Sequence, residues 1–205
     1  MIWLDPMAGP GRNRSEQSRC AILETALHLA RTKGYANLTM NGIAAEAKVG
    51  KQTIYRWWSS KAAVVLEALR EFARMEIEAP DSGALFTDLD EFLSNTFLSD
   101  KRRTGIDSVL RAMMAEAQHD PAFAELFRRE FIDSRRAYLQ TIFERARARD
   151  EIPSTRDSRL WIDIAFGVMW YRLLAEVGPI NRRLSRKLAL LLTEAAGASV
   201  PPNRS

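Results

Sequence analysis

Hydrophobic residues recur along most of the chain at the three- and four-residue spacing of amphipathic helices. Residues 15–33 show this pattern, and Gly34 stands where a helix commonly ends. Across residues 38–61 the pattern predicts two short helices joined by a tight turn at residues 48–50. No alternating pattern typical of strands extends beyond a few residues, so we expect an all-α fold.

Clusters of turn residues separate the later helices. Ser60 is placed to cap a fourth helix reaching about Ile77, and a Pro-Asp-Ser-Gly sequence at 80–83 breaks the chain after it. Asp120 with Pro121, and Asp157, are placed to begin two of the later helices. The expected later helices are 85–97, 106–118, 121–149, 157–174 and 184–196, which makes about nine in all.

The two short helices carry side chains suited to reading DNA. Thr39 is placed to cap the first of them, and Ile54 and Trp58 are expected to anchor the second. Basic and polar side chains share the outward face of the second helix: Lys51, Gln52, Thr53, Tyr55 and Arg56. Arginine and lysine pair with phosphate or guanine, and glutamine suits adenine. This arrangement predicts a helix-turn-helix that binds DNA.

The charge distribution supports the same function. Residues 1–66 contain nine Lys and Arg but four Asp and Glu, so they carry a net charge of +5. The whole chain carries +4, which leaves −1 for the remainder. A basic N-terminal third attached to a nearly neutral body is typical of a DNA-binding domain joined to another domain.

Residues between Ile22 and Lys61 follow the pattern of a known family of DNA-binding proteins. The positions that match are Ala26-Leu27-His28-Leu29-Ala30, Gly34-Tyr35, Leu38-Thr39-Met40, Ile43-Ala44, Ala47, Val49-Gly50-Lys51-Gln52-Thr53-Ile54-Tyr55-Arg56-Trp57-Trp58 and Ser60-Lys61. This run resembles the N-terminal domain of the tetracycline-repressor (TetR/AcrR) family of bacterial transcriptional regulators. Lys48 stands where that family usually has glycine, and Gly50 stands where it usually has a Ser or Thr cap.

The resemblance implies roles for particular side chains. Thr39, Tyr55 and Lys61 would contact phosphates. Apart from the resemblance, Trp57 is placed to stack near the DNA backbone. The bases of the major groove would be faced by Lys51, Gln52, Thr53 and Arg56. Packing against the first helix is the alternative for Tyr55, and a solvated lysine is the alternative for Lys61.

The body of the chain holds many bulky apolar side chains, which are typical of adaptable ligand cavities. An ordinary packed core is the alternative interpretation, and the resemblance favours an effector pocket. The candidate ligand-binding residues are Phe92, Met113, Met114, Phe127, Trp161, Phe166, Met169 and Trp170.

The resemblance also implies a homodimer held by the last two helices, which would present two reading helices to a near-palindromic operator on double-stranded DNA. We expect a repressor released by a small, largely apolar effector, with the fourth helix as the lever between the two regions. The expected divisions are a flexible N-terminal arm (1–14), a helix-turn-helix domain (15–59), a connecting helix (60–79), a ligand-binding and dimerisation domain (80–197) and a flexible C-terminal tail (198–205).

Other functional classes have weaker support. Glu116 and His119 have the spacing used in di-iron bundles, but no second such pair occurs, and no catalytic residue, metal site or cofactor is expected. A DNA-binding architectural protein without an effector remains a third interpretation. No apolar run is long enough to span a membrane, and Cys20 as the single cysteine suits the reducing cytoplasm.

Overall fold

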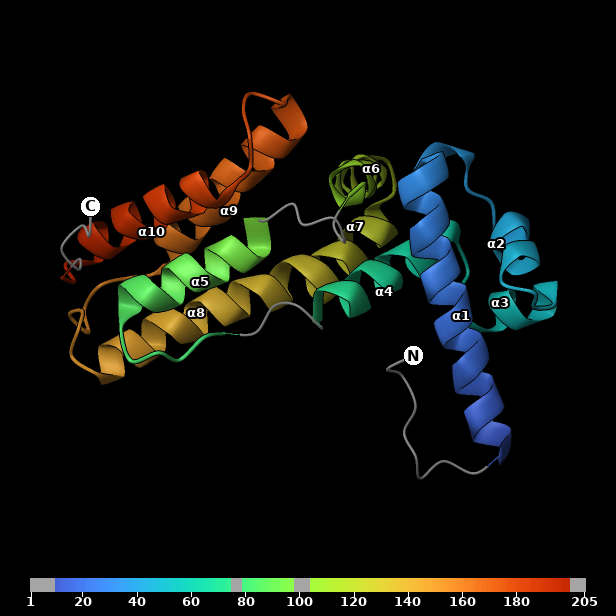
Figure 1. The fold of residues 1–205 in the computed structure, drawn as a ribbon, viewed down its shortest axis with the longest axis horizontal. Helices are drawn as coiled ribbons and strands as arrows, with labels where there is room; N and C mark the ends of the chain where they lie inside the picture. Colours follow the sequence, from blue (N-terminus) through green and yellow to red (C-terminus); the bar gives the residue numbers. More distant parts are fainter. Residues whose placement is uncertain (1–9, 75–78, 98–103, 200–205) are drawn as a thin grey trace. The chain divides into compact units, whose positions relative to one another are not determined.

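The computed structural model describes residues 10–74, 79–97 and 104–199 (Figure 1). These residues form helices and connecting loops and contain no strand, which confirms the all-α prediction. The elements are α1 (Pro10–Lys33), the 3-10 helix η1 (Tyr35–Asn37), α2 (Met40–Glu46), α3 (Lys51–Trp57), α4 (Lys61–Arg74), α5 (Leu85–Phe97), α6 (Ile106–His119), α7 (Pro121–Phe127), α8 (Asp133–Ala148), α9 (Arg159–Ala175) and α10 (Arg182–Ala196). A π-helical segment, Arg128–Ile132, joins α7 to α8.

The chain forms two compact units. The head unit comprises Met1–Phe72 and Gly105–Arg128, and the bundle unit comprises Ala73–Thr104 and Arg129–Ser205. α6 and α7, which lie within the segment 80–197, cluster with the helix-turn-helix in the head unit. The division therefore falls within the last turn of α4 and at the π-helical segment.

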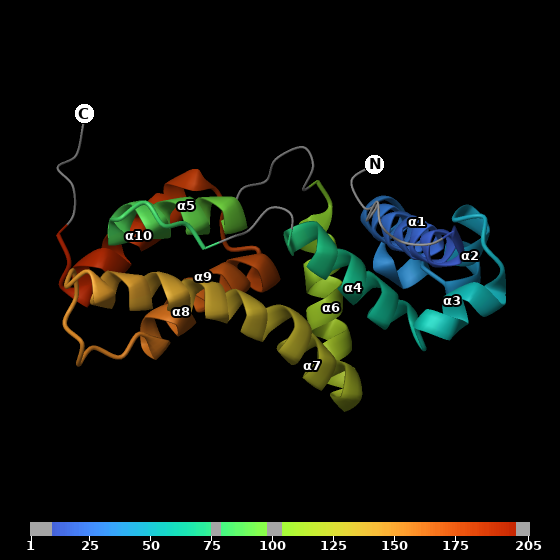
Figure 2. The ribbon, with the colours of Figure 1, turned by 90° about the horizontal axis from the view of Figure 1, so that it is seen from below.

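In the head unit, α1 packs against α2, η1 and α6, while α2 packs against α3 (Figures 1 and 2). The side chains that fill its interior are buried and apolar: Ile22, Ala26, Ile43, Ile54, Val65, Leu69, Val109 and Met113. Burial of this shared apolar surface holds the short helices α2 and α3, which are too short to be stable alone.

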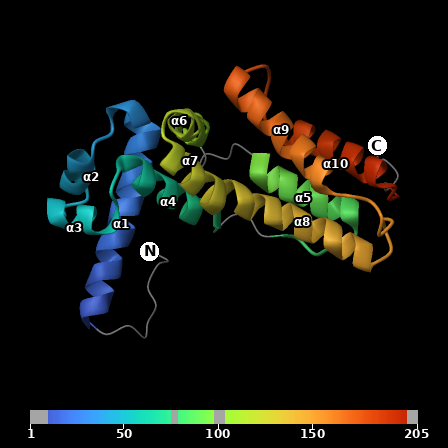
Figure 3. The same ribbon diagram turned by 180° about the vertical axis from the view of Figure 1, so that it is seen from behind.

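In the bundle unit, α5 packs against α8 and α10, and α8 packs against α9 (Figure 3). Their inward faces form one hydrophobic core that includes Leu89, Phe92, Phe143, Trp161 and Leu188. A buried carboxylate also joins the loop before α5 to the end of α8. Asp88 accepts hydrogen bonds from the backbone N–H of Ser82 at 2.7 Å and from Arg149 at 3.3 Å.

Local capping explains several helix boundaries. The backbone N–H of Gly42 donates to Thr39 Oγ1 at 3.0 Å, and that of Ala63 donates to Ser60 Oγ at 3.2 Å. Asp120 Oδ1 accepts from the first turn of α7. Gly34 follows α1 with a φ of 81°, a left-handed angle that glycine adopts without strain. These predicted caps are confirmed.

Other boundaries differ from the predictions. α1 begins at Pro10 rather than Ser15, because proline is pre-organised for the first helical position. The helix predicted over 121–149 contains the π-helical segment. Ser158 rather than Asp157 occupies the cap of α9, although Asp157 Oδ1 does accept from the Arg159 N–H at 2.9 Å.

α9 ends one residue beyond the predicted end at 174. Its last residue is Ala175, and Glu176 then adopts a left-handed φ of 53°. Three further predictions concern segments partly outside the described residues, namely the arm at 1–14, the continuation of the fourth helix to Ile77 and the tail at 198–205.

Candidate nucleic-acid interface

The turn between α2 and α3 keeps a tight geometry without the usual glycine. Lys48 adopts a left-handed φ of 56°, and the Val49 N–H donates to the Ala44 carbonyl at 2.9 Å. Gly50 occupies the cap of α3 without a side-chain hydrogen bond. The backbone therefore accommodates Lys48 and Gly50, the two positions that differ from the usual family pattern, and α3 begins at Lys51.

One face of α3 is buried and the other is open. Ile54 lies in the core of the head unit, and Trp58 is buried directly after the helix, so both predicted anchors are confirmed. Most of the remaining candidates on this helix are exposed: Lys51, Gln52, Tyr55, Arg56 and Trp57, while Thr53 is half-buried. The structure thus brings the predicted reading residues together on one accessible surface.

Aromatic residues add to this surface. Tyr55 is 53% exposed and Trp57 is 40% exposed, so Tyr55 is not the packed aromatic of the alternative interpretation. The Arg56 guanidinium lies 5.6 Å from the centre of the Trp57 ring, and its NH2 group donates to Ser15 Oγ at 3.5 Å. These contacts orient Arg56 between Trp57 and the N-terminal half of α1.

Thr39 and Lys61 lie at the starts of α2 and α4, the helices that precede and follow α3 in the chain. Thr39 is exposed at the start of α2. Lys61 Nζ donates to the carbonyls of Tyr35 and Ala36 at 3.1 and 3.4 Å, and it lies 4.4 Å from the centre of the Tyr35 ring. Lys61 is therefore not simply a solvated lysine, because it ties the first turn of α4 to η1.

A contact that the sequence analysis missed fixes the end of α3. The indole Nε1 of Trp58 donates to Glu67 Oε2 at 2.6 Å, and the other oxygen of Glu67 pairs with Arg19 of α1. Burial opposes the charge on Arg19, but the hydrogen bond and charge of Glu67 raise its pKa. A buried indole usually has an acceptor, so Trp58 was a signal that such a partner exists.

Removing this carboxylate should destabilise the head unit. In Glu67→Ala, the Trp58 N–H would be left without its acceptor, which costs about 1–3 kcal/mol for a buried donor. Urea unfolding followed by tryptophan fluorescence measures the loss. Glu46→Ala, at an exposed position of α2, should change stability by no more than about 0.5 kcal/mol. Equal effects of the two substitutions would contradict the role of Glu67.

Two segments of the chain match models of known protein families. Residues 22–68 match the family model described as bacterial regulatory proteins, tetR family. Residues 79–192, more than half of the chain, match the tetracyclin repressor-like C-terminal domain. The chain belongs to the TetR family.

Relatives of this TetR-family regulator agree with the match. The HTH-type transcriptional regulator YdeS of Bacillus subtilis is 32% identical over 88% of this chain and 90% of its own. The DNA-binding transcriptional repressor TetR of Mycobacteroides abscessus is 30% identical over 82% of this chain and 87% of its own. The crystal structure of the TetR family regulator SCO0332 has a TM-score of 0.75 at 27% identity, covering 90% of this chain and all of that one. The protein is thus a transcriptional regulator with a helix-turn-helix DNA-binding domain.

The candidate ligand-binding residues of this TetR-family chain are divided between its units. Met113 and Phe127 are buried in the head unit, where Met114 is half-buried. The other five belong to the bundle unit: Phe92, Trp161, Phe166 and Met169 lie in its core, and Trp170 packs against that core. The latter group is the one that the structure brings together.

The residues considered for other chemistry have different surroundings. Burial of the Tyr35 hydroxyl, and secondly the negative charge of Glu116, raise the pKa of Tyr35 well above its usual value. His119 is exposed, and the described residues contain no group of three or more His, Cys, Asp or Glu placed to hold a metal ion. Burial raises the pKa of the Cys20 thiol, which lowers its reactivity. TetR-family members are transcriptional regulators rather than enzymes.

The length and polarity of the helices bear on membrane association. Within residues 10–74, 79–97 and 104–199, no helix is both long and apolar enough to cross a membrane.

Proposed function

We propose that this regulator is a cytoplasmic, dimeric repressor that binds a near-palindromic operator and releases it when a small, largely apolar effector binds. The observation that carries the proposal is the two-sided character of α3. Ile54 and Trp58 hold the helix against the head unit, and the opposite side presents basic, polar and aromatic groups together. Such a helix enters the major groove with its first turn foremost.

The side chains would divide the recognition between bases and phosphates. Gln52 and Thr53, in the first turn of α3, would reach base edges together with Lys51 and Arg56. The phosphate contacts would come from Thr39, Tyr55, Trp57 and Lys61. A lysine ammonium has three donors, and two of those of Lys61 are directed at carbonyls, so the third suits a phosphate.

Lys61→Ala should weaken binding to all DNA sequences alike. The loss of one phosphate contact in each copy reduces the slope of log K against log salt by about 1 per copy. Fluorescence anisotropy with operator and random DNA at several salt concentrations measures both quantities. Lys33→Ala, an exposed lysine of the same unit, is the matched control. A loss confined to the operator would show that Lys61 reads bases instead.

Dimerisation through α9 and α10 would place two α3 helices about one turn of DNA apart, roughly 34–36 Å. Large apolar side chains on these helices are exposed, which supports a further contact there: Leu160, Tyr171, Leu174 and Leu191. Two identical heads related by two-fold symmetry would require a near-palindromic target.

The effector would bind in the bundle unit, where the aromatic and methionine side chains Phe92, Trp161, Phe166 and Met169 gather. The effector would prefer a conformer in which the two head units are wrongly spaced for the operator. Such an effector weakens DNA binding, and DNA weakens effector binding by the same factor. The division between units falls within α4, which supports its role as the lever between effector and head.

Sequencing the genomic fragments that the purified protein retains is the experiment that tests this function. We expect a few near-palindromic sites, protected in a footprint by a dimer, and a neighbouring gene that indicates the chemistry of the effector. Retention of random fragments by a monomer would contradict the proposal. Site-specific binding that no compound releases would favour the alternative of an architectural protein without an effector.

A further inference from the structure

Tyr35 has a buried hydroxyl group that makes no hydrogen bond with the described part of the chain. The residue begins η1, and only 9% of it is exposed. A buried hydroxyl without a partner is unfavourable, because it loses its hydrogen bonds with water and gains none in return. A state of the head unit in which this hydroxyl has an acceptor is therefore favoured over one in which it has none.

Glu116 of α6 carries the charge that acts on this hydroxyl. Its carboxylate contributes, after burial, to the raised pKa of Tyr35, and a charge has such an effect only over a short distance. The Glu116 side chain is half-buried and has three rotatable bonds. Its carboxylate can therefore turn to accept a hydrogen bond from the Tyr35 hydroxyl.

α6 is held closely against the helix that precedes η1. Gly105, directly before α6, has a left-handed φ of 83°, and a Cβ at this position would lie 2.9 Å from the carbonyl oxygen of Arg31 in α1. Glycine alone combines this angle with this close approach. α6 also packs against η1, so the head unit gives Glu116 a defined position beside Tyr35.

Lys61 contacts other parts of the same tyrosine. Its ammonium lies 4.4 Å from the centre of the Tyr35 ring and donates to the Tyr35 carbonyl at 3.1 Å. η1 has three residues, and such a short 3-10 turn depends on its surroundings to keep its shape. The position of Tyr35 therefore determines where the Lys61 ammonium lies.

We propose that Glu116 is a positioning residue for DNA binding: when the head unit binds DNA, its carboxylate accepts a hydrogen bond from the Tyr35 hydroxyl and thereby holds η1 where Lys61 reaches a phosphate. The proposal rests on the phosphate contact proposed for Lys61. It gives an acidic side chain a favourable role in DNA binding, opposite in sign to the direct repulsion between a carboxylate and the phosphates.

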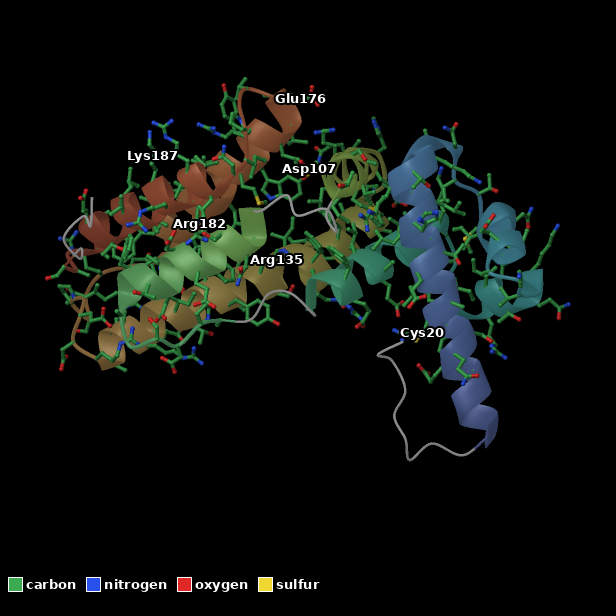
Figure 4. The ribbon with its side chains drawn as sticks, viewed as in Figure 1. Cys20, Asp107, Arg135, Glu176, Arg182 and Lys187 are labelled. Carbon is green, nitrogen blue, oxygen red and sulfur yellow. The ribbon has the colours of Figure 1, made fainter. Side chains whose placement is uncertain are left out.

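This difference in sign allows a direct test by fluorescence anisotropy with operator and random DNA. Glu116→Ala should weaken binding to both by roughly two- to ten-fold for each copy bound, which corresponds to one hydrogen bond. Loss of the negative charge alone would strengthen binding instead. Glu116→Gln should bind like the wild type, because its amide oxygen still accepts. Asp107→Ala removes an exposed carboxylate from the first turn of the same helix (Figure 4) and should not weaken binding.

Two further variants distinguish positioning from a general structural role. Tyr35→Phe keeps the ring beside Lys61 but removes the hydroxyl, so it should weaken DNA binding as Glu116→Ala does. It should unfold at the same or a higher urea concentration than the wild type, because an unpaired buried hydroxyl is lost. In a Lys61→Ala background, neither substitution should weaken DNA binding further, since both act through the Lys61 ammonium.

The outcomes separate this inference from the proposed function. A wild-type protein that binds its operator, together with a Glu116→Ala protein that binds DNA equally or more tightly, would overturn the positioning role and leave the DNA-binding regulator intact. Equal losses with and without Lys61 would also overturn it. A wild-type protein that does not bind a specific DNA site would overturn both.

Discussion

Gln52→Ala is expected to weaken binding to the operator by about 2–6 kcal/mol, because each of the two copies loses about 1–3 kcal/mol of base recognition. Gln52 is exposed in the first turn of α3, one residue after Lys51 begins the helix. Burial of Ile54 fixes the orientation of that turn. The glutamine amide both donates and accepts, so its loss should relax discrimination at one base pair of each half-site.

Titration of the operator and of random DNA at one salt concentration measures this effect. Binding to random DNA should change little, since phosphate contacts dominate it. Gln118→Ala, an exposed glutamine of α6, is the matched control and should leave both affinities unchanged. Equal losses on operator and random DNA would show that the reading face of α3 is misassigned.

Phe143→Ala is expected to destabilise the bundle unit by about 3–5 kcal/mol. Phe143 is fully buried, and its ring lies 5.2 Å from the ring of Trp161 at an angle of 44°. The substitution removes the apolar contacts of α8 with α9 and leaves a cavity that the surrounding helices fill only in part. Such a loss is a large fraction of the roughly 5–15 kcal/mol that stabilises a typical domain.

Urea denaturation at fixed protein concentration measures this loss, because dimer formation also contributes to apparent stability. Glu144→Ala, at the adjacent exposed position, should change stability by no more than about 0.5 kcal/mol. A Phe143→Ala protein as stable as Glu144→Ala would mean that the bundle core repacks without a cavity.

Local chemistry made many helix ends predictable. Thr39 and Asp120 accept hydrogen bonds from the first turns of α2 and α7, and Gly34 ends α1, because these caps depend on neighbouring residues only. The start of α1 was less predictable, since residues 10–14 lack an apolar pattern. The π-helical segment at Arg128–Ile132 also leaves the hydrophobic spacing of the sequence nearly unchanged.

In the candidate site, too, some features could be predicted from the sequence and others could not. The exposed positions on α3 follow from helical spacing and from the buried Ile54 and Trp58. The contacts of Lys61 with η1 and of Glu67 with Trp58 join residues nine to 26 positions apart, and spacing along one helix does not indicate them. For Met113 and Phe127, assignment to the head unit depends on how α6 and α7 pack.

The sequence by itself determined the all-α class, the helix-turn-helix and most of its outward side chains, because amphipathic spacing and capping are local properties. The tertiary structure alone decided which helices share a core and which charged groups have partners. These features depend on contacts between segments distant in sequence, and many pairings of amphipathic helices satisfy the same apolar pattern.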